Sequence, residues 1–105
     1  MISSEAIKAL YDNAAEVADR LRVMANRDRL LLLCRLAAGE ASVGELVAVT
    51  GLSQSSVSQH LAVLREAGAV RVRPEQQTRH YSLADPRMHR LIEALCNASR
   101  PIGER

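Results

Sequence analysis

Aromatic side chains are nearly absent from this chain of 105 residues, which contains no Phe and no Trp. Its aromatic residues are Tyr11 and Tyr81. Protein modules that bind single-stranded nucleic acid by stacking bases on aromatic rings need more rings than this. The composition therefore excludes that class. Since 48% of the residues are hydrophobic and only two residues are aromatic, the composition also predicts an aliphatic core.

Apolar runs long enough to cross a bilayer are absent as well. The longest run, residues 30–38, is interrupted by Arg35 and has about half of the roughly 18 residues that a membrane span needs. The N-terminus carries Glu5, Lys8 and Asp12 instead of a basic segment followed by an apolar one, so it lacks the pattern of a secretory signal. We therefore expect no membrane partner and a cytoplasmic location.

Cysteine is scarce, with Cys34 and Cys96 the two examples. Two distant cysteines do not make the disulfide framework of a small secreted domain, and in a reducing compartment they rest as thiols. Pairing between them would depend on conditions. The length predicts one domain, residues 1–105, with enough buried surface to fold without disulfide or metal support.

Charge is unevenly distributed although the net charge is only +2. Residues 1–52 hold six basic and seven acidic side chains, whereas residues 53–105 hold eight basic and five acidic ones. Thirteen of the fourteen basic residues are Arg, which favours bidentate contacts to phosphate or guanine. The second half of the chain therefore permits nucleic-acid binding, without proving it.

The first third of the chain has the periodicity of two helices. An apolar stripe predicts a helix over about residues 4–25, and the stripe consists of Leu10, Ala14, Val17, Leu21 and Met24. Residues 27–38 are apolar on nearly every side, which is typical of a helix in the centre of a fold. Gly39 ends this second helix.

Two short helices separated by a tight turn follow. Ser42 and Glu45 form a capping box for a helix that runs to about Thr50, and Gly51 ends it. Ser53 then caps a helix over about residues 53–67, which ends before a glycine. The buried side of that helix is predicted from i, i+4, i+7 spacing, at Val57, Leu61 and Leu64.

After Gly68 the hydrophobic period changes from 3.6 to 2, which predicts a two-stranded hairpin over about residues 69–83. We expect residues 74–77 to form its connection. Asp85 and Pro86 then start a last helix, about residues 86–98. Its apolar stripe is Met88, Leu91, Ile92 and Leu95.

The order of these elements predicts the fold class: mainly α with a small β-hairpin, a winged helix-turn-helix. In that fold the helix at 53–67 is the recognition helix, which lies in the major groove of DNA, and the hairpin at 69–83 is the wing. The exposed side of the recognition helix is polar but uncharged, whereas a merely solvated side usually carries Glu and Lys. Gln can bond adenine bidentately, and Ala62 lets the helix approach a thymine methyl group.

We therefore predict a DNA-reading surface, with an inert solvated surface as the weaker interpretation. Four arginines beside it are candidates for phosphate contacts, although each alone is more often a solvated charge. They are Arg65, Arg71, Arg73 and Arg79. The predicted DNA-binding set is Gln54, Ser55, Ser56, Ser58, Gln59, His60, Arg65, Arg73, Gln77 and Arg79.

Several strings in this chain resemble the core of the ArsR/SmtB family of bacterial repressors. They are residues 42–46, 51–61 and 64–68, and the resemblance extends from about residue 18 to residue 98. Residues 24–26, the pair Leu33-Cys34 and the glycine-free residues 75–78 are similar to the HlyU, BigR and SqrR group of that family. The resemblance implies a homodimer, joined through the helices at 4–25 and 86–98, that represses a double-stranded operator until a small inducer acts.

Metal sensing is common in that family, but the residues for it are missing here. The family's Cys-Val-Cys string corresponds to Ser42 and Gly44, which supply no thiolate, and the other familiar site on the last helices is not reproduced. His89, Glu93 and Cys96 lie at i, i+4, i+7 and form a weak alternative metal set. A solvated helix flank is the preferred interpretation, and we expect no cofactor.

The HlyU-like group instead implies a thiol sensor. There, a cysteine at the Cys34 position pairs with one near the end of the last helix, and oxidation or persulfide bridging releases DNA. Here Cys96 lies one helical turn early and Arg100 occupies the expected place, which shifts the sulfur by about 6 Å without changing its face. Inert packing of Cys34 in an apolar helix is the competing interpretation.

Two function classes remain after these steps. One is a DNA-binding repressor, thiol- or metal-responsive, and the other is a protein-interaction module that keeps the fold without reading DNA. An enzyme is not expected, because His60, His80 and His89 have no neighbouring nucleophile pattern and the chain has no glycine-rich phosphate loop.

Overall fold

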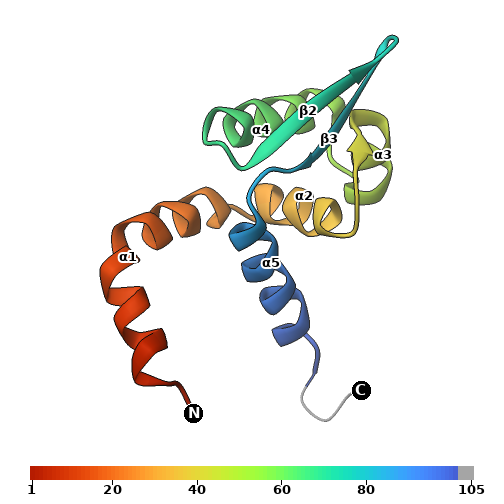
Figure 1. The fold of residues 1–105 in the computed structure, drawn as a ribbon. Coiled ribbons are helices and arrows are strands. Elements are labelled where there is room, and N and C mark those ends of the chain that lie inside the picture. The colour runs from red at the N-terminus through yellow and green to blue at the C-terminus, as the bar shows by residue number, and fades with distance from the viewer. Residues whose placement is uncertain (102–105) are drawn as a thin grey trace.

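The computed structural model describes residues 1–101, in which helices and a small sheet alternate as expected. The elements are α1 (Ser4–Met24), α2 (Arg27–Ala37), β1 (Ala41–Ser42), α3 (Val43–Thr50), α4 (Gln54–Glu66), β2 (Val70–Glu75), β3 (Thr78–Leu83) and α5 (Pro86–Ala98). Figure 1 shows that α2, α3, α4 and the strands form one body, from which α1 and α5 extend as two separate arms. No helix within the described residues is long and apolar enough to cross a membrane.

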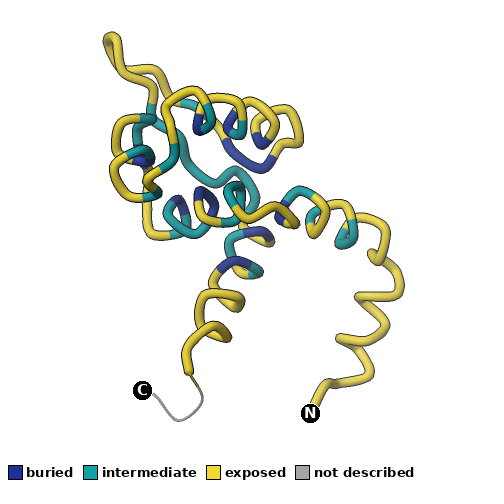
Figure 2. Tube along the Cα trace, turned by 180° about the vertical axis from the view of Figure 1, so that it is seen from behind, coloured by how far each residue is buried: buried dark blue, intermediate teal, exposed yellow. Residues whose placement is uncertain are grey.

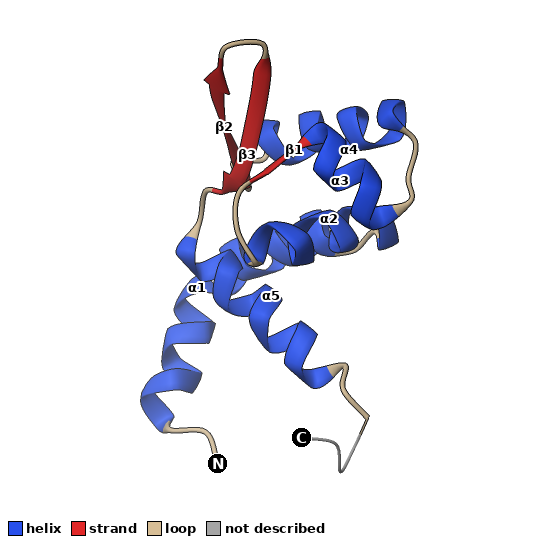
Figure 3. Cartoon of the chain, turned by 90° about the vertical axis from the view of Figure 1, so that its right-hand side faces the viewer, coloured by secondary structure: helices blue, strands red, loops and turns tan. Residues whose placement is uncertain are grey.

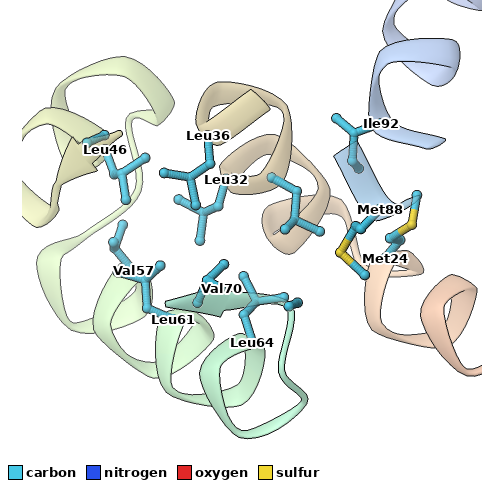
Figure 4. Packing of buried hydrophobic residues seen from close by; sticks show 13 residues of the cluster. Met24, Leu32, Leu36, Leu46, Val57, Leu61, Leu64, Val70, Met88 and Ile92 are labelled. Atoms are coloured by element: carbon cyan, nitrogen blue, oxygen red, sulfur yellow. The ribbon is translucent and has the colours of Figure 1, made fainter. Parts of the chain in front are cut away.

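The core lies between α2, α4 and the base of the hairpin. Leu32 and Leu33 of α2 are fully buried, as are Leu46 of α3 and Leu64 of α4. Figure 4 shows side chains from these helices and Val70 of β2 pointing toward one another. All thirteen buried core residues are aliphatic or Met, so the predicted aliphatic core is confirmed.

The helix ends follow the predicted caps closely. Ser42 and Glu45 form a capping box in both directions, with donor–acceptor distances of 3.1 and 3.2 Å. Gly51 ends α3 with φ +74°, and Gly68 has φ +76° after α4. A residue without a Cβ adopts this left-handed conformation at little cost, so the sharp turn between α3 and α4 depends on Gly51.

The sheet has three strands, whereas the sequence predicted two. Ala41 and Ser42 pair with Tyr81 and His80, which gives the strand order β1-β3-β2. Two residues are too short to show an alternating pattern, so periodicity could not find β1. The connection is also shorter than predicted, because β2 continues to Glu75 and β3 begins at Thr78.

Gln76, in the turn at the tip of the hairpin, is the one non-glycine residue among the described ones with positive φ, +56°. The left-handed conformation costs a residue with a Cβ roughly 1–2 kcal/mol.

Figure 3 shows the hairpin standing clear of the helices, with α1 and α5 extending from the other end of the molecule.

Helix α1 is bent at Asn13, where φ and ψ leave the helical region. The Asn13 side chain donates to the carbonyl of Ala9 at 2.8 Å, so it competes for the acceptor that the helical backbone would use. The predicted helix is therefore present, but as two segments.

The two apolar stripes on α1 and α5 differ in burial. Met88 and Ile92 of α5 belong to the core, with 3% and 0% exposure, whereas Leu95 is 42% exposed. On α1 Met24 is buried, while Leu10 and Leu21 remain about half exposed. Figure 2 shows that the N-terminal half of α1 and the end of α5 are exposed throughout. The two arms thus leave apolar side chains uncovered in the single chain.

Candidate nucleic-acid interface and thiol pair

Helix α4 presents a continuous polar surface to solvent. Its inner side is fixed by Val57, Leu61 and Leu64, which are at most 1% exposed. The opposite side is therefore exposed and carries Gln54, Ser55, Ser58, Gln59 and Ala62. These side chains are short or uncharged, so the helix can approach a base-pair edge closely.

Two predicted DNA-binding residues of α4 are less exposed than the others on that helix. Ser56 is half-buried, and its backbone N–H donates to the Ser53 side chain at 3.1 Å. His60 is also half-buried, with its Nε2 atom 3.8 Å from Oδ2 of Asp28 on α2. We conclude that His60 contributes to contact between α4 and α2, and that the exposed polar residues are better placed to reach DNA.

The register of the hairpin divides the wing arginines between two faces. Val72 pairs with Tyr81, and Pro74 pairs with Arg79. Cross-strand partners point to the same side of a sheet, and Tyr81 packs against the core. Arg79 therefore lies on the inner face, toward α4.

Arg79 and Arg65 line one hollow between α4 and the wing. Its volume is about 460 Å³, and Ser58, Ala62 and Glu66 are among its other lining residues. A second hollow of about 270 Å³ is lined by the same two arginines. Neither guanidinium belongs to the ion pairs formed within residues 1–101. Two cations beside the polar side of α4 make a suitable phosphate contact.

The other two arginines have protein partners on the outer face. Arg73 forms hydrogen bonds with Glu40 and Glu75, and Arg71 donates to the carbonyl of Ala84 at 3.1 Å. Arg73 was predicted to contact DNA, and Glu40 was missed. The only sequence signal that could have pointed to Glu40 is its position directly before β1, and β1 is too short to be recognised from the sequence.

Gln77 lies at the hairpin tip and is exposed. With Thr78 and Arg79 it lines a hollow of about 440 Å³ that also reaches Ser42 and Gly44 at the start of α3. A hairpin tip held beside the helix-turn-helix can reach the DNA backbone or the neighbouring groove. Its DNA-contacting role stays a prediction.

Cys34 and Cys96 lie together despite the shifted position of the second cysteine. The Sγ atoms are 3.1 Å apart, with Cys34 on α2 half-buried and Cys96 on α5 exposed. Burial, and then the hydrogen bond and charge of Cys96, raise the pKa of Cys34 from 9.0 to about 11. Both are free thiols in this structure. The one-turn displacement therefore preserves a pair of sulfurs within bonding reach.

The alternative metal set on α5 is not assembled. His89 Nε2 lies 3.1 Å from the carbonyl oxygen of Ala37, and its Nδ1 lies 3.5 Å from Glu93. No cluster of three His, Cys, Asp or Glu side chains suited to a metal ion occurs in residues 1–101. His89 instead contacts the end of α2, so the described residues give no support to the weak alternative metal set of His89, Glu93 and Cys96.

The arms α1 and α5 border a shallow apolar hollow of about 470 Å³. Leu10 and Val17 line it from α1, and Leu91 lines it from α5. Arg20 and Arg90 also line it. Leu10 is thus one uncovered apolar side chain that borders the hollow, whereas Leu21 and Leu95 are not part of its lining.

Comparison with known proteins gives a consistent result. Residues 26–72 match the family of bacterial regulatory proteins described as the arsR family. The biofilm growth-associated repressor of Agrobacterium fabrum is 48% identical over 89 residues, which covers 85% of this chain and 76% of that protein. The transcriptional activator HlyU of Vibrio cholerae is 44% identical over 89 residues, covering 85% and 82%.

Solved structures show the same similarity. The transcriptional repressor BigR from Xylella fastidiosa superposes with a TM-score of 0.84 at 36% identity and covers 90% of this chain and 96% of that one. Reduced HlyU from Vibrio cholerae gives 0.81 at 41% identity, covering 90% and 99%. A homodimeric winged helix-turn-helix DNA-binding domain from Mycobacterium bovis gives 0.70 at 30% identity, covering 92% and 87%.

Proposed function

The chain belongs to the arsR family of bacterial regulatory proteins, which bind DNA, and on that premise we propose that it is a homodimeric, sequence-specific repressor released from its operator by thiol chemistry. The observation that carries the proposal is the 3.1 Å separation of the Cys34 and Cys96 sulfurs. The proposal includes no enzymatic step. A repressor works where the DNA is, so we assign it to the cytoplasm.

DNA reading is supported by the exposed, uncharged side of α4 and by the two arginines beside it. In this proposal Gln59 and Ser58 contact base edges, while Arg65 and Arg79 neutralise phosphates. The solvent-exposed position of Gln59 and the shared hollow of the two arginines agree with those roles.

Dimerisation is supported by the uncovered apolar side chains of the two arms. Leu10 and Leu21 of α1 and Leu95 of α5 are each more than 40% exposed, and a hollow lies between the arms. The related Mycobacterium bovis domain is homodimeric. A dimer would cover these residues and place two recognition helices about one DNA turn apart.

The proposed oxidation begins at Cys96, because this thiol is exposed and Cys34 is half-buried. The Cys96 thiolate attacks the terminal sulfur of a low-molecular-weight persulfide, RSSH, and RS⁻ leaves, so Cys96 becomes a persulfide. The Cys34 thiolate then attacks the inner sulfur and displaces HS⁻, which forms the disulfide. The two cysteines are oxidised by two electrons and RSSH is reduced to RS⁻ and HS⁻.

The bridge would join α5 to α2. Helix α5 follows β3 directly, and its first turn is held by Asp85, which caps the helix and pairs with Arg20 of α1 at 2.9 Å. A shift of α5 would therefore also move the wing, through β3, and α1, through the pair of Asp85 and Arg20. Only a state that binds the operator less well can account for release.

An operator shift assay tests the switch. The probe is a duplex that the reduced wild-type protein selects from a randomised library. Diamide or a persulfide donor is expected to lower the affinity of the wild type, whereas Cys34→Ser and Cys96→Ser should stay bound. Mass spectrometry should find a bridge between Cys34 and Cys96 within one subunit. Release of DNA by both treated variants, or absence of that bridge, would contradict the thiol switch.

A further inference from the structure

The outer face of the sheet carries a charged group that has no role in the proposed DNA contacts. Arg73 on β2 lies opposite His80 on β3, and Ser42 on β1 lies opposite His80 on the other side. These three residues share one face, because cross-strand partners do. Arg79 lies on the other face, toward α4.

Arg73 connects the hairpin to the far edge of the sheet. Its Nη2 atom lies 2.7 Å from Oε1 of Glu40 and its Nε atom lies 3.2 Å from Oε2, a two-point contact. Glu40 immediately precedes β1, and the strand order is β1-β3-β2. The guanidinium therefore crosses the middle strand. Bidentate pairs of this kind have the best-defined geometry of the arginine–carboxylate contacts.

A second carboxylate completes the group. Arg73 Nη1 lies 3.2 Å from Oε2 of Glu75, and Glu75 also lies 3.5 Å from Nε2 of His80. The hydrogen bond from Arg73 holds the pKa of Glu40 below its usual range, so Glu40 is ionised at neutral pH. A DNA phosphate would have to displace two carboxylates to reach this guanidinium and would be repelled by both.

We propose that Arg73 is a positioning residue of the DNA-binding surface, which braces the wing against the segment ahead of β1 and thereby holds Arg79 beside α4. This inference rests on the proposed DNA reading. The brace matters because the outer half of the hairpin projects beyond the helices (Figure 3). Without it, DNA binding must restrict a more mobile wing, which weakens association.

Three variants and one control test the brace. They are Arg73→Gln, Glu40→Gln, the double variant, and Arg79→Gln as the control for a phosphate contact. Binding to the selected duplex is measured over a range of salt concentrations. At high salt the long-range effect of losing one distant charge on DNA binding is screened, so the affinity that is still lost comes from the broken contact. Arg73→Gln and Glu40→Gln should each lower affinity about two- to fivefold, as expected for an exposed pair.

The double variant should bind like Arg73→Gln alone, because once Arg73 is gone Glu40 has no brace contact left to lose. The salt slope should stay at the wild-type value in all three, whereas Arg79→Gln should reduce it by about 0.9 for each phosphate that the protein no longer neutralises. A reduced slope for Arg73→Gln, tighter binding by Glu40→Gln, additive losses or unchanged affinities would each overturn the proposal.

Amide hydrogen exchange provides a test without DNA. Exchange in β2 and β3 should accelerate in both single variants, since the hairpin opens more often when the brace is broken. Unchanged exchange would overturn the brace whatever the binding results. If the wild type selects no duplex, the proposed function fails, while exchange still decides whether Arg73 holds the wing.

Discussion

The polar side chains of α4 divide into those that reach outward and those that hold the helix in place. Gln59 is exposed, with both a donor and an acceptor at its end. His60, the next residue, faces Asp28 of α2 instead. Sequence alone could not separate these two neighbours, because a helical face is defined to within about one residue until the packing is known.

Gln59→Ala is the test of base reading at this scale. We expect a loss of about 1–3 kcal/mol on the selected duplex and weaker discrimination at one base pair in each half-site. Arg79→Gln should weaken binding to all sequences alike. Competition with random duplex DNA measures the difference, and an equal loss on cognate and random DNA would exclude Gln59 from base reading.

The two thiols should differ in their reaction with an alkylating agent. Burial, followed by the influence of Cys96, raises the pKa of Cys34 to about 11, and the thiolate is the reactive form. The thiolate fraction of Cys34 is therefore small at neutral pH and grows as the pH approaches that value. The exposed Cys96 should therefore react faster than Cys34 at pH 8, because each unit by which the pKa of Cys34 is raised lowers its thiolate fraction about tenfold and burial limits access to it.

Iodoacetamide labelling of the wild type checks this order, because the contact between the two thiols is intact there. Mass spectrometry of short reactions gives the labelling rate of each cysteine separately. Labelling of Cys34 should accelerate steadily as pH rises from 8 to 10. Equal labelling rates at pH 8, or faster labelling of Cys34, would contradict the proposal that Cys96 reacts first.

At the scale of elements, local signals in the sequence predicted the helices well. Ser42, Gly51 and Asp85 act within one or two turns of their own positions, and the structure has each in its predicted capping role. Features that depend on distant partners were not predictable. Strand β1 requires β3 as its neighbour, and the contact between Arg73 and Glu40 joins residues 33 positions apart.

The glycines at the two ends of α3 give a stability test with opposite signs. Gly51→Ala should destabilise the fold by about 1–2 kcal/mol, because φ is +74° although a Cβ would meet no atom within 4 Å. Gly44→Ala should stabilise it by about 0.4–1 kcal/mol, since its Cβ would lie 3.9 Å from the Ser42 side chain, an ordinary contact. Urea unfolding measures both. The same sign for the two variants would show that chain conformation is not the cause.

At the scale of the whole molecule, the two arms decide how many recognition helices meet the DNA. Leu21 and Leu95 are 48% and 42% exposed and are not part of the core. Replacing either with Glu should produce monomers, because the dimer would bury the new charge. Operator affinity should fall strongly, since two tethered recognition helices are needed for two half-sites. Sedimentation that finds unchanged dimers in both variants would place the interface elsewhere.

The length of the sulfur bridge should control how far α5 moves. The reduced sulfurs are already 3.1 Å apart, and a disulfide bond is about 2.05 Å long, so a simple disulfide requires only a small approach of α5 to α2. Each additional sulfur lengthens the bridge by roughly one such bond and would push the two helices apart. Because the packed core resists gradual deformation, the longer bridge should favour a different arrangement of α5 and its arm.

A persulfide donor is therefore expected to release DNA more completely than diamide, which makes only the disulfide. When a second RSSH also converts Cys34 to a persulfide, with RS⁻ leaving, the Cys96 persulfide attacks the inner sulfur on Cys34 and displaces HS⁻, which leaves a trisulfide. Mass spectrometry should find this trisulfide between Cys34 and Cys96 in the persulfide-treated sample. Operator affinity is then compared at equal extents of bridging. Equal loss of affinity from both treatments would mean that joining α5 to α2 is sufficient, and that the length of the bridge has no part in the switch.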